Sequence, residues 1–87
     1  DDAGSQNLYG NLLLAAGHRP EAIEHLAAAV RLAPANADYH NQLGIALGRA
    51  GRLREALVEF EAALKLDPAH PSAAKNAALA RQSLGGY

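Results

Sequence analysis

The sequence contains no cysteine, methionine or tryptophan, and its aromatic residues are three tyrosines and one phenylalanine. Without cysteine, neither a disulfide nor a thiolate metal site can help the chain to fold. A chain of 87 residues buries only about 60–65% of the surface that its unfolded form exposes. Stability must therefore come from side-chain packing. The composition is rich in alanine and leucine and poor in β-branched residues, which favours helices.

The sequence also lacks an excess of charge and a long apolar run. Eight basic and nine acidic residues give a formal net charge of −1, so nothing favours binding to phosphates, and nucleic acid is not an expected partner. No apolar run approaches the roughly 20 residues of a membrane span, and no signal peptide is visible. We therefore expect no membrane partner. The chain begins with aspartate, so we expect a fragment of a longer protein; the compartment stays open, with the cytoplasm only weakly favoured.

Patterns of catalytic residues are missing as well. The three serines have no glycine elbow around them, and the glycines stand singly instead of forming a phosphate-binding loop. The four histidines form no i, i+4 pair, and no carboxylate completes a facial metal site. We expect no enzyme activity in these residues, no catalytic residue, no metal and no cofactor. The histidines are expected at the surface or at helix interfaces; they are His18, His25, His40 and His70.

A repeat of 34 residues is the dominant feature of what the sequence does contain. It relates Gly17 to Gly51 and Gly85, and it also relates five pairs of residues, which are Gly10 and Gly44, Ala22 and Ala56, Ala29 and Ala63, Leu32 and Leu66, and Pro34 and Pro68. A fixed period of this length indicates a stacked array of supersecondary units. Arrays of this kind present surfaces rather than reactive groups.

Five helices are predicted from the apolar spacing of three and four residues. They cover residues 5–16, residue 20 up to Pro34, residues 37–50, 53–66 and 71–84. Gly17 and Gly51 are expected to end helices in the left-handed conformation, and Gly85 with Gly86 to close the last helix. Asn36 is a predicted N-cap. The short connections predict that sequential helices are antiparallel neighbours.

The second repeat carries a known pattern: Leu43-Gly44, Ala56 followed by Phe60 four residues later, and Pro68. Leu47 replaces the usual tyrosine and His40 the leading tryptophan. The first repeat keeps several of the same places, namely Gly10, Leu13, Ala22, Leu26 and Pro34, with Gln6 at the tryptophan place. This pattern resembles the tetratricopeptide repeat.

The resemblance implies an all-α, right-handed solenoid of antiparallel helix hairpins. It divides the single domain 1–87 into repeat one at about 3–36, repeat two at 37–70, and a capping helix at 71–85. Gly10 and Gly44 are expected where the two helices of a hairpin approach closely. Leu26 and Phe60 are expected to fill the gap between adjacent repeats.

The two ends of the array differ. Arg81 stands one period after Leu47, where a following helix would pack, and a polar outer face is typical of a capping repeat. At the other end, Tyr9, Leu12 and Leu13 form an apolar edge. Such an edge permits self-assembly into a homo-oligomer.

The resemblance also implies a binding groove, because the first helix of each tetratricopeptide repeat lines a concave surface. Five amide side chains fall on that surface, and an amide can both donate and accept hydrogen bonds to a peptide backbone. This looks like the asparagine ladder of the O-linked N-acetylglucosamine transferase arrays; alternatively, these amides are simply tolerated on a solvated face. The implied groove residues are Asn7, Leu8, Asn11, Asp38, Asn41, Gln42, Ile45, Arg49, Lys75, Asn76 and Leu79.

A second family pattern can be compared directly. Chaperone-binding members hold a peptide carboxylate with two lysines, one arginine and two asparagines. The matching places here are Asn7, Asn11, Gln42, Ser72 and Asn76. Only Asn11 agrees and all three cations are missing, which disfavours a chaperone tail. Arg49 and Lys75 still favour an acidic ligand weakly.

The function predicted from the sequence is non-catalytic protein–protein interaction. An extended peptide or partner helix would lie in the groove, anchored on Ile45, Leu79 and Leu8. Replacing Asn41 and Asn76 together with alanine is expected to weaken binding and leave helicity intact. Two alternatives stay open: a scaffold that self-assembles through the N-terminal edge, and a substrate-docking segment of a larger enzyme.

Overall fold

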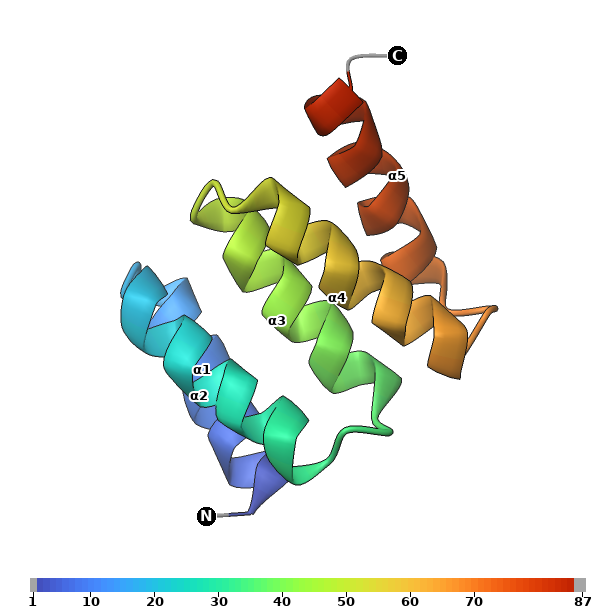
Figure 1. Cartoon of the computed structure of the whole chain (residues 1–87). Coiled ribbons are helices and arrows are strands. Elements are labelled where there is room, and N and C mark those ends of the chain that lie inside the picture. Colours follow the sequence, from blue (N-terminus) through green and yellow to red (C-terminus); the bar gives the residue numbers. More distant parts are fainter. Residues whose placement is uncertain (1, 86–87) are drawn as a thin grey trace.

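The computed structural model describes residues 2–85, which form five α-helices and no strand. Two antiparallel hairpins are followed by one more helix, so the described residues form an elongated stack with extents of 40 × 26 × 16 Å. The first hairpin and α5 lie at opposite ends of this stack (Figure 1). All five predicted helices are present: α1 (Ala3–Ala15), α2 (Arg19–Leu32), α3 (Ala37–Arg49), α4 (Leu53–Leu66) and α5 (Pro71–Gly85).

The helix starts follow from their caps. Helix α1 begins at Ala3, two residues earlier than predicted, because Asp2 Oδ1 accepts the backbone N–H of Ser5 at 2.7 Å. Helix α3 has the predicted N-cap, since Asn36 Oδ1 accepts the backbone N–H of Tyr39 at 3.1 Å. Side-chain oxygens at this position satisfy a donor that has no partner inside the helix.

Glycine turns the chain at the end of α1 and α3. Gly17 has φ of 87° and Gly51 has φ of 81°, the left-handed conformation predicted for both. The two turns are built alike, since the N–H of His18 bonds the carbonyl of Leu13 and the N–H of Arg52 bonds that of Leu47, each at 2.9 Å. Helix α5 ends at Gly85 within the described residues, one residue later than predicted; Gly86, the other residue predicted to close this helix, lies outside the described residues.

Close contact between the helices of each hairpin depends on a missing side chain. A Cβ atom on Gly44 would lie 2.5 Å from Phe60 Cε1, and one on Gly10 would lie 2.6 Å from Leu26 Cγ. Both glycines are therefore needed for the approach that the sequence predicted. Leu26 and Phe60 fill the space beside these glycines inside their own hairpins, and Phe60 also lines a pocket that residues of α5 share.

The core between helices consists mainly of alanine and leucine. Ala22, Ala29, Ala46, Ala56, Ala63, Ala73 and Ala77 are fully buried, and Leu14, Leu26, Leu43, Leu47 and Phe60 complete the buried interior. The alanines let the helices lie close together, and leucine fills the remaining space. This packing fixes α1, α3 and α5 relative to one another, with α3 in contact with both of the others.

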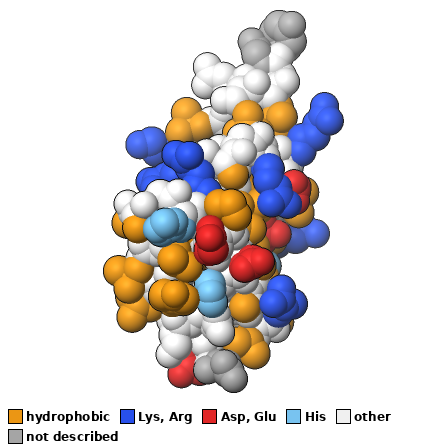
Figure 2. All heavy atoms as spheres, turned by 90° about the vertical axis from the view of Figure 1, so that its left-hand side faces the viewer, with side chains coloured by type: hydrophobic (Ala, Val, Ile, Leu, Met, Phe, Trp, Pro, Cys, Tyr) orange, Lys and Arg blue, Asp and Glu red, His pale blue; other side chains and the backbone are white. Residues whose placement is uncertain are grey.

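The two ends of the stack differ as predicted. Helix α1 exposes Leu8 (63%), Tyr9 (52%) and Leu12 (60%), and hydrophobic side chains show in several groups on the end of the molecule that carries the first hairpin (Figure 2). Leu13 instead packs half-buried against the core, so it does not belong to this edge. At the other end Arg81 is exposed and pairs with Glu61 at 3.1 Å. No helix within residues 2–85 has the length and apolar character needed to cross a membrane.

Candidate functional site

A pocket of about 230 Å³ lies where α3, α4 and α5 meet. We call it the α3–α5 pocket, because those two helices supply its polar side chains. Four of the predicted groove residues line it: Ile45, Arg49, Asn76 and Leu79. The other lining residues are Gly44, Gly48, Leu53, Ala56, Phe60, Ala80 and Ser83.

The surface of this pocket is mostly apolar. Phe60 and Leu53 of α4 line the pocket together with Ile45 of α3. Leu79 of α5 also lines it, and its side chain is 51% exposed. An apolar concavity with a few polar groups is typical of a ligand site. Sequence reasoning did not include Leu53, Phe60 or Ser83 in the site. The 34-residue period could have predicted Ser83, because this residue stands one period after the predicted groove residue Arg49.

Among residues 2–85, Arg49 is the one cationic side chain that lines the pocket. It is exposed, and it forms no ion pair with another residue of the range 2–85. Arg52, in the turn that follows, differs because its guanidinium lies 2.6 Å from the Glu55 carboxylate. The hydrogen bond from Arg52 lowers the pKa of Glu55 and raises that of Arg52.

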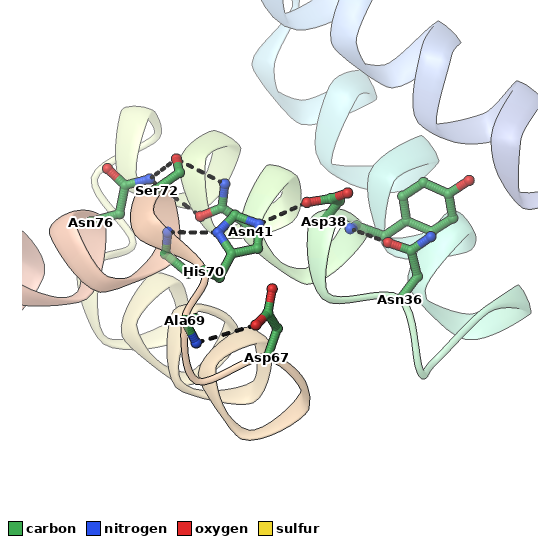
Figure 3. Close-up of polar contacts among 10 residues, drawn as sticks. Asn36, Asp38, Asn41, Asp67, Ala69, His70, Ser72 and Asn76 are labelled. Carbon is green, nitrogen blue, oxygen red and sulfur yellow. Dashed lines mark hydrogen bonds and ion pairs between the residues drawn. The ribbon is translucent and has the colours of Figure 1, made fainter.

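Three polar side chains connect α3 to α5 beside the pocket (Figure 3). Asn41 Nδ2 donates to Ser72 Oγ at 3.2 Å, and Asn41 Oδ1 accepts from Asn76 Nδ2 at 3.2 Å. Asn76 Nδ2 also lies 3.4 Å from Ser72 Oγ. We call these three residues the amide cluster.

Asn41 is only 3% exposed, and both of its polar side-chain atoms form hydrogen bonds within the amide cluster. Its hydrogen bonds hold α3 against α5, and its replacement would disturb the packing of these helices. Asn76 is different, because it is only half-buried and lines the pocket. An amide nitrogen carries two hydrogens, and both have acceptors within the amide cluster. The Asn76 oxygen accepts no hydrogen bond from the other residues of the range 2–85.

The amide cluster is not repeated between α1 and α3. Asn7 stands one period before Asn41, but its buried Oδ1 has no hydrogen-bond partner within the described part of the chain, residues 2–85. Asp38 and Gln42 hold the places that Ser72 and Asn76 hold one period later. The carboxylate of Asp38 is instead 2.7 Å from His70 Nε2.

Three histidines bridge pairs of helices. His70 Nδ1 accepts the backbone N–H of Ala73 at 3.1 Å, which caps α5 and assigns the proton of the neutral ring to Nε2, facing Asp38. His40 of α3 contacts Glu59 of α4 at 2.9 Å. One period before His40 and Glu59 stand Gln6 of α1 and His25 of α2, and Gln6 Oε1 lies 2.7 Å from His25 Nδ1. Both hairpins are therefore joined by a histidine contact at equivalent positions. The histidine belongs to the second helix in the first repeat and to the first helix in the second repeat. Among the described residues, no three His, Asp or Glu side chains come together as metal ligands.

The remaining predicted groove residues lie outside the pocket. Leu8, Asp38 and Lys75 are exposed, whereas Asn7, Asn11 and Gln42 are half-buried. The structure thus brings four predicted residues together at the pocket and buries one, Asn41, in the amide cluster.

A family model for the tetratricopeptide repeat matches residues 9–71 and again residues 41–85. The chain belongs to the tetratricopeptide repeat family. The fold is the all-α helical solenoid of this family. A search among curated proteins finds no sequence match.

Solved tetratricopeptide structures superpose closely on the chain. The Sgt2 TPR domain from Aspergillus fumigatus is 27% identical with a TM-score of 0.92, over 98% of this chain and 56% of that one. The second TPR of Spaghetti (RPAP3), bound to the HSP90 peptide SRMEEVD, is 26% identical with a TM-score of 0.94, over 99% and 80%. The first TPR of Spaghetti, bound to the same peptide, is 21% identical with a TM-score of 0.94, over 98% and 68%. The chain thus spans about half of the Sgt2 structure. The family assignment supports a role as a protein-interaction module.

Proposed function

We propose that the chain is a non-catalytic module that binds an extended peptide, or a partner helix, on the side formed by α1, α3 and α5. The α3–α5 pocket is the observation that carries this function. It offers apolar surface from Ile45, Leu79 and Phe60, and it is large enough for one aliphatic side chain of a partner. Burying such a side chain contributes about 1.5–3 kcal/mol.

Polar groups beside the pocket fit the backbone of an extended peptide. Such a backbone has donors and acceptors without partners of its own. The free oxygen of Asn76 can accept one of its N–H groups, and the half-buried amides of Asn11 and Gln42 continue across α1 and α3. Asn41 is not included, because the amide cluster uses both of its polar atoms.

The peptide proposed for this chain differs from the one bound by its structural neighbours. Both Spaghetti domains were solved with a peptide of HSP90. In this chain the five places of the family's carboxylate clamp carry no cation. A chaperone tail held by that clamp is therefore not the proposed ligand.

The test is a pair of charge insertions on exposed apolar residues. Leu79→Lys alters the pocket, whereas Val58→Lys alters α4 at a side chain that is 61% exposed and lines a different hollow, between α2 and α4. Peptides selected from a random heptapeptide display library are titrated against both variants and the parent protein. We expect Leu79→Lys to weaken binding at least about tenfold, a loss of 1.4 kcal/mol, and Val58→Lys to leave it unchanged. Selected peptides that bind all three proteins equally, or no selectable peptide at all, would contradict the proposed function.

Self-association is the second candidate, because Leu8, Tyr9 and Leu12 form an exposed apolar edge on α1. In α3 the residues one period after Tyr9 and Leu12 are Leu43 and Ala46, which are buried at 6% and 0% exposure. The face of α3 that corresponds to this edge of α1 is thus buried, and α3 packs against the helices of the preceding repeat. Light scattering over a range of concentrations tests this candidate. A mass that rises with concentration in the parent and not in Leu12→Glu supports it, and a constant monomer mass rejects it.

A further inference from the structure

We propose that the α3–α5 pocket holds the carboxyl-terminal residue of a peptide, with its apolar side chain inside the pocket and its carboxylate on Arg49. This assignment rests on the proposed function. It specifies which end of the peptide the chain recognises and which residue recognises it. Arg49 lies outside the five places at which the family's carboxylate clamp would stand in this chain.

The first support is the position of the charge. Arg49 follows Ile45 by one helical turn, and side chains at this spacing lie about 5–6 Å apart at Cβ. Both residues line the pocket. The guanidinium has no ion-pair partner among residues 2–85, and its planar group can bind both oxygens of a carboxylate.

The second support is the short distance between apolar surface and charge. Neighbouring residues of an extended peptide point to opposite sides, and the next residue on the same side lies about 6.5–7 Å further along. An internal acidic residue therefore points away from its apolar neighbour or lies well beyond it. A carboxyl-terminal residue carries its side chain and its carboxylate on one Cα atom, which matches the adjacent placement of Ile45 and Arg49.

The third support is the polar group on the opposite wall. Asn76 projects from α5 into the lining of the pocket, and its amide nitrogen is already engaged by Asn41 and Ser72. Its oxygen can accept the backbone N–H of the terminal residue. A terminal residue seated in this way satisfies three groups at once: the apolar pocket, the cation of Arg49 and the acceptor of Asn76.

Small probes test the assignment without a known partner. N-acetyl-leucine carries the side chain, the carboxylate and one N–H; N-acetyl-leucinamide lacks the carboxylate, and N-acetylglycine lacks the side chain. Each is titrated at millimolar concentrations into isotope-labelled protein, and backbone amide shifts are followed by NMR. The variants are Arg49→Gln and, as a control, Arg54→Gln, which removes an equal charge from an exposed position of α4 outside the pocket.

We expect N-acetyl-leucine to shift the amides of Ile45, Arg49, Leu79 and Ser83. N-acetyl-leucinamide should bind about threefold to fivefold more weakly, as expected for one exposed ion pair, and N-acetylglycine should bind more weakly still. Arg49→Gln should bring N-acetyl-leucine down to the affinity of the amide, and Arg54→Gln should not. Added salt should reduce the difference between acid and amide.

Other outcomes overturn the assignment. Equal binding of acid and amide, an equal effect of both arginine variants, or no binding of N-acetyl-leucine would each reject it. A blocked peptide with an internal aspartate two residues after leucine must also bind more weakly than the same peptide ending in a free carboxylate at leucine. If these probes fail while selected peptides still bind in a manner that depends on Leu79, the terminal-residue assignment is lost and the proposed function stands.

Discussion

Gly44→Ala tests the packing that holds each hairpin together. Alanine in place of glycine inside a helix contributes about 1 kcal/mol of stability. At Gly44 the new Cβ would lie 2.5, 2.7 and 3.0 Å from three ring atoms of Phe60. That ring is only 5% exposed and cannot move without disturbing the core. Overpacking of this kind costs about 1–3 kcal/mol. Set against the gain from helix propensity, this leaves an expected net loss of up to about 2 kcal/mol in the free energy of unfolding.

Gly48 provides the matched control, one turn further along α3. A Cβ atom there would lie 3.9 Å from that of Ala56, an ordinary contact. Gly48→Ala should therefore raise the free energy of unfolding by about 0.5–1 kcal/mol through helix propensity alone. Urea unfolding followed by circular dichroism measures both variants. Equal effects of the two substitutions, or a stabilised Gly44→Ala, would refute the close-contact reasoning.

Three further predictions concern polar contacts. Asn41→Ala should lower the free energy of unfolding by about 1–3 kcal/mol in urea, because it leaves polar atoms of the amide cluster without partners; a neutral result would mean that the cluster does not hold α5. His70→Ala should remove a cap worth about 1 kcal/mol and speed hydrogen exchange at Ala73, and unchanged exchange there would contradict the capping role. The hydrogen bond from Ser5 lowers the pKa of Asp2, so this cap stabilises α1 above the unfolded pKa of about 3.9 and is lost as pH falls through the folded value. Hydrogen exchange of α1 should show that loss in the parent and not in Asp2→Asn, which caps without titrating; an equal acid response in both would count against it.

Most of the fold could be predicted from the sequence because its signals are local. The 34-residue period placed equivalent turns at Gly17 and Gly51, and both have the left-handed conformation that the prediction required. Helix ends shifted by one or two residues, as at Ala3, where Asp2 supplies a cap that apolar spacing does not reveal.

The candidate site was predictable only in part, because it depends on contacts across the repeats. Helical spacing placed Ile45 and Arg49 on one face, and both line the pocket. The same spacing placed Asn41 there, yet Ser72 and Asn76 of α5 bury it by hydrogen bonding. At the equivalent place Asn7 differs, because Asp38 and Gln42 stand where Ser72 and Asn76 stand one period later, and no hydrogen bond joins Asn7 to either of them among residues 2–85.

We propose that partners bind on the side of α1, α3 and α5, at the α3–α5 pocket. A crystal structure of the chain with a peptide selected from the display library would test this proposal. We expect an apolar side chain of that peptide to lie between Ile45 and Leu79. A peptide bound in the hollow between α2 and α4, with the pocket left empty, would contradict it.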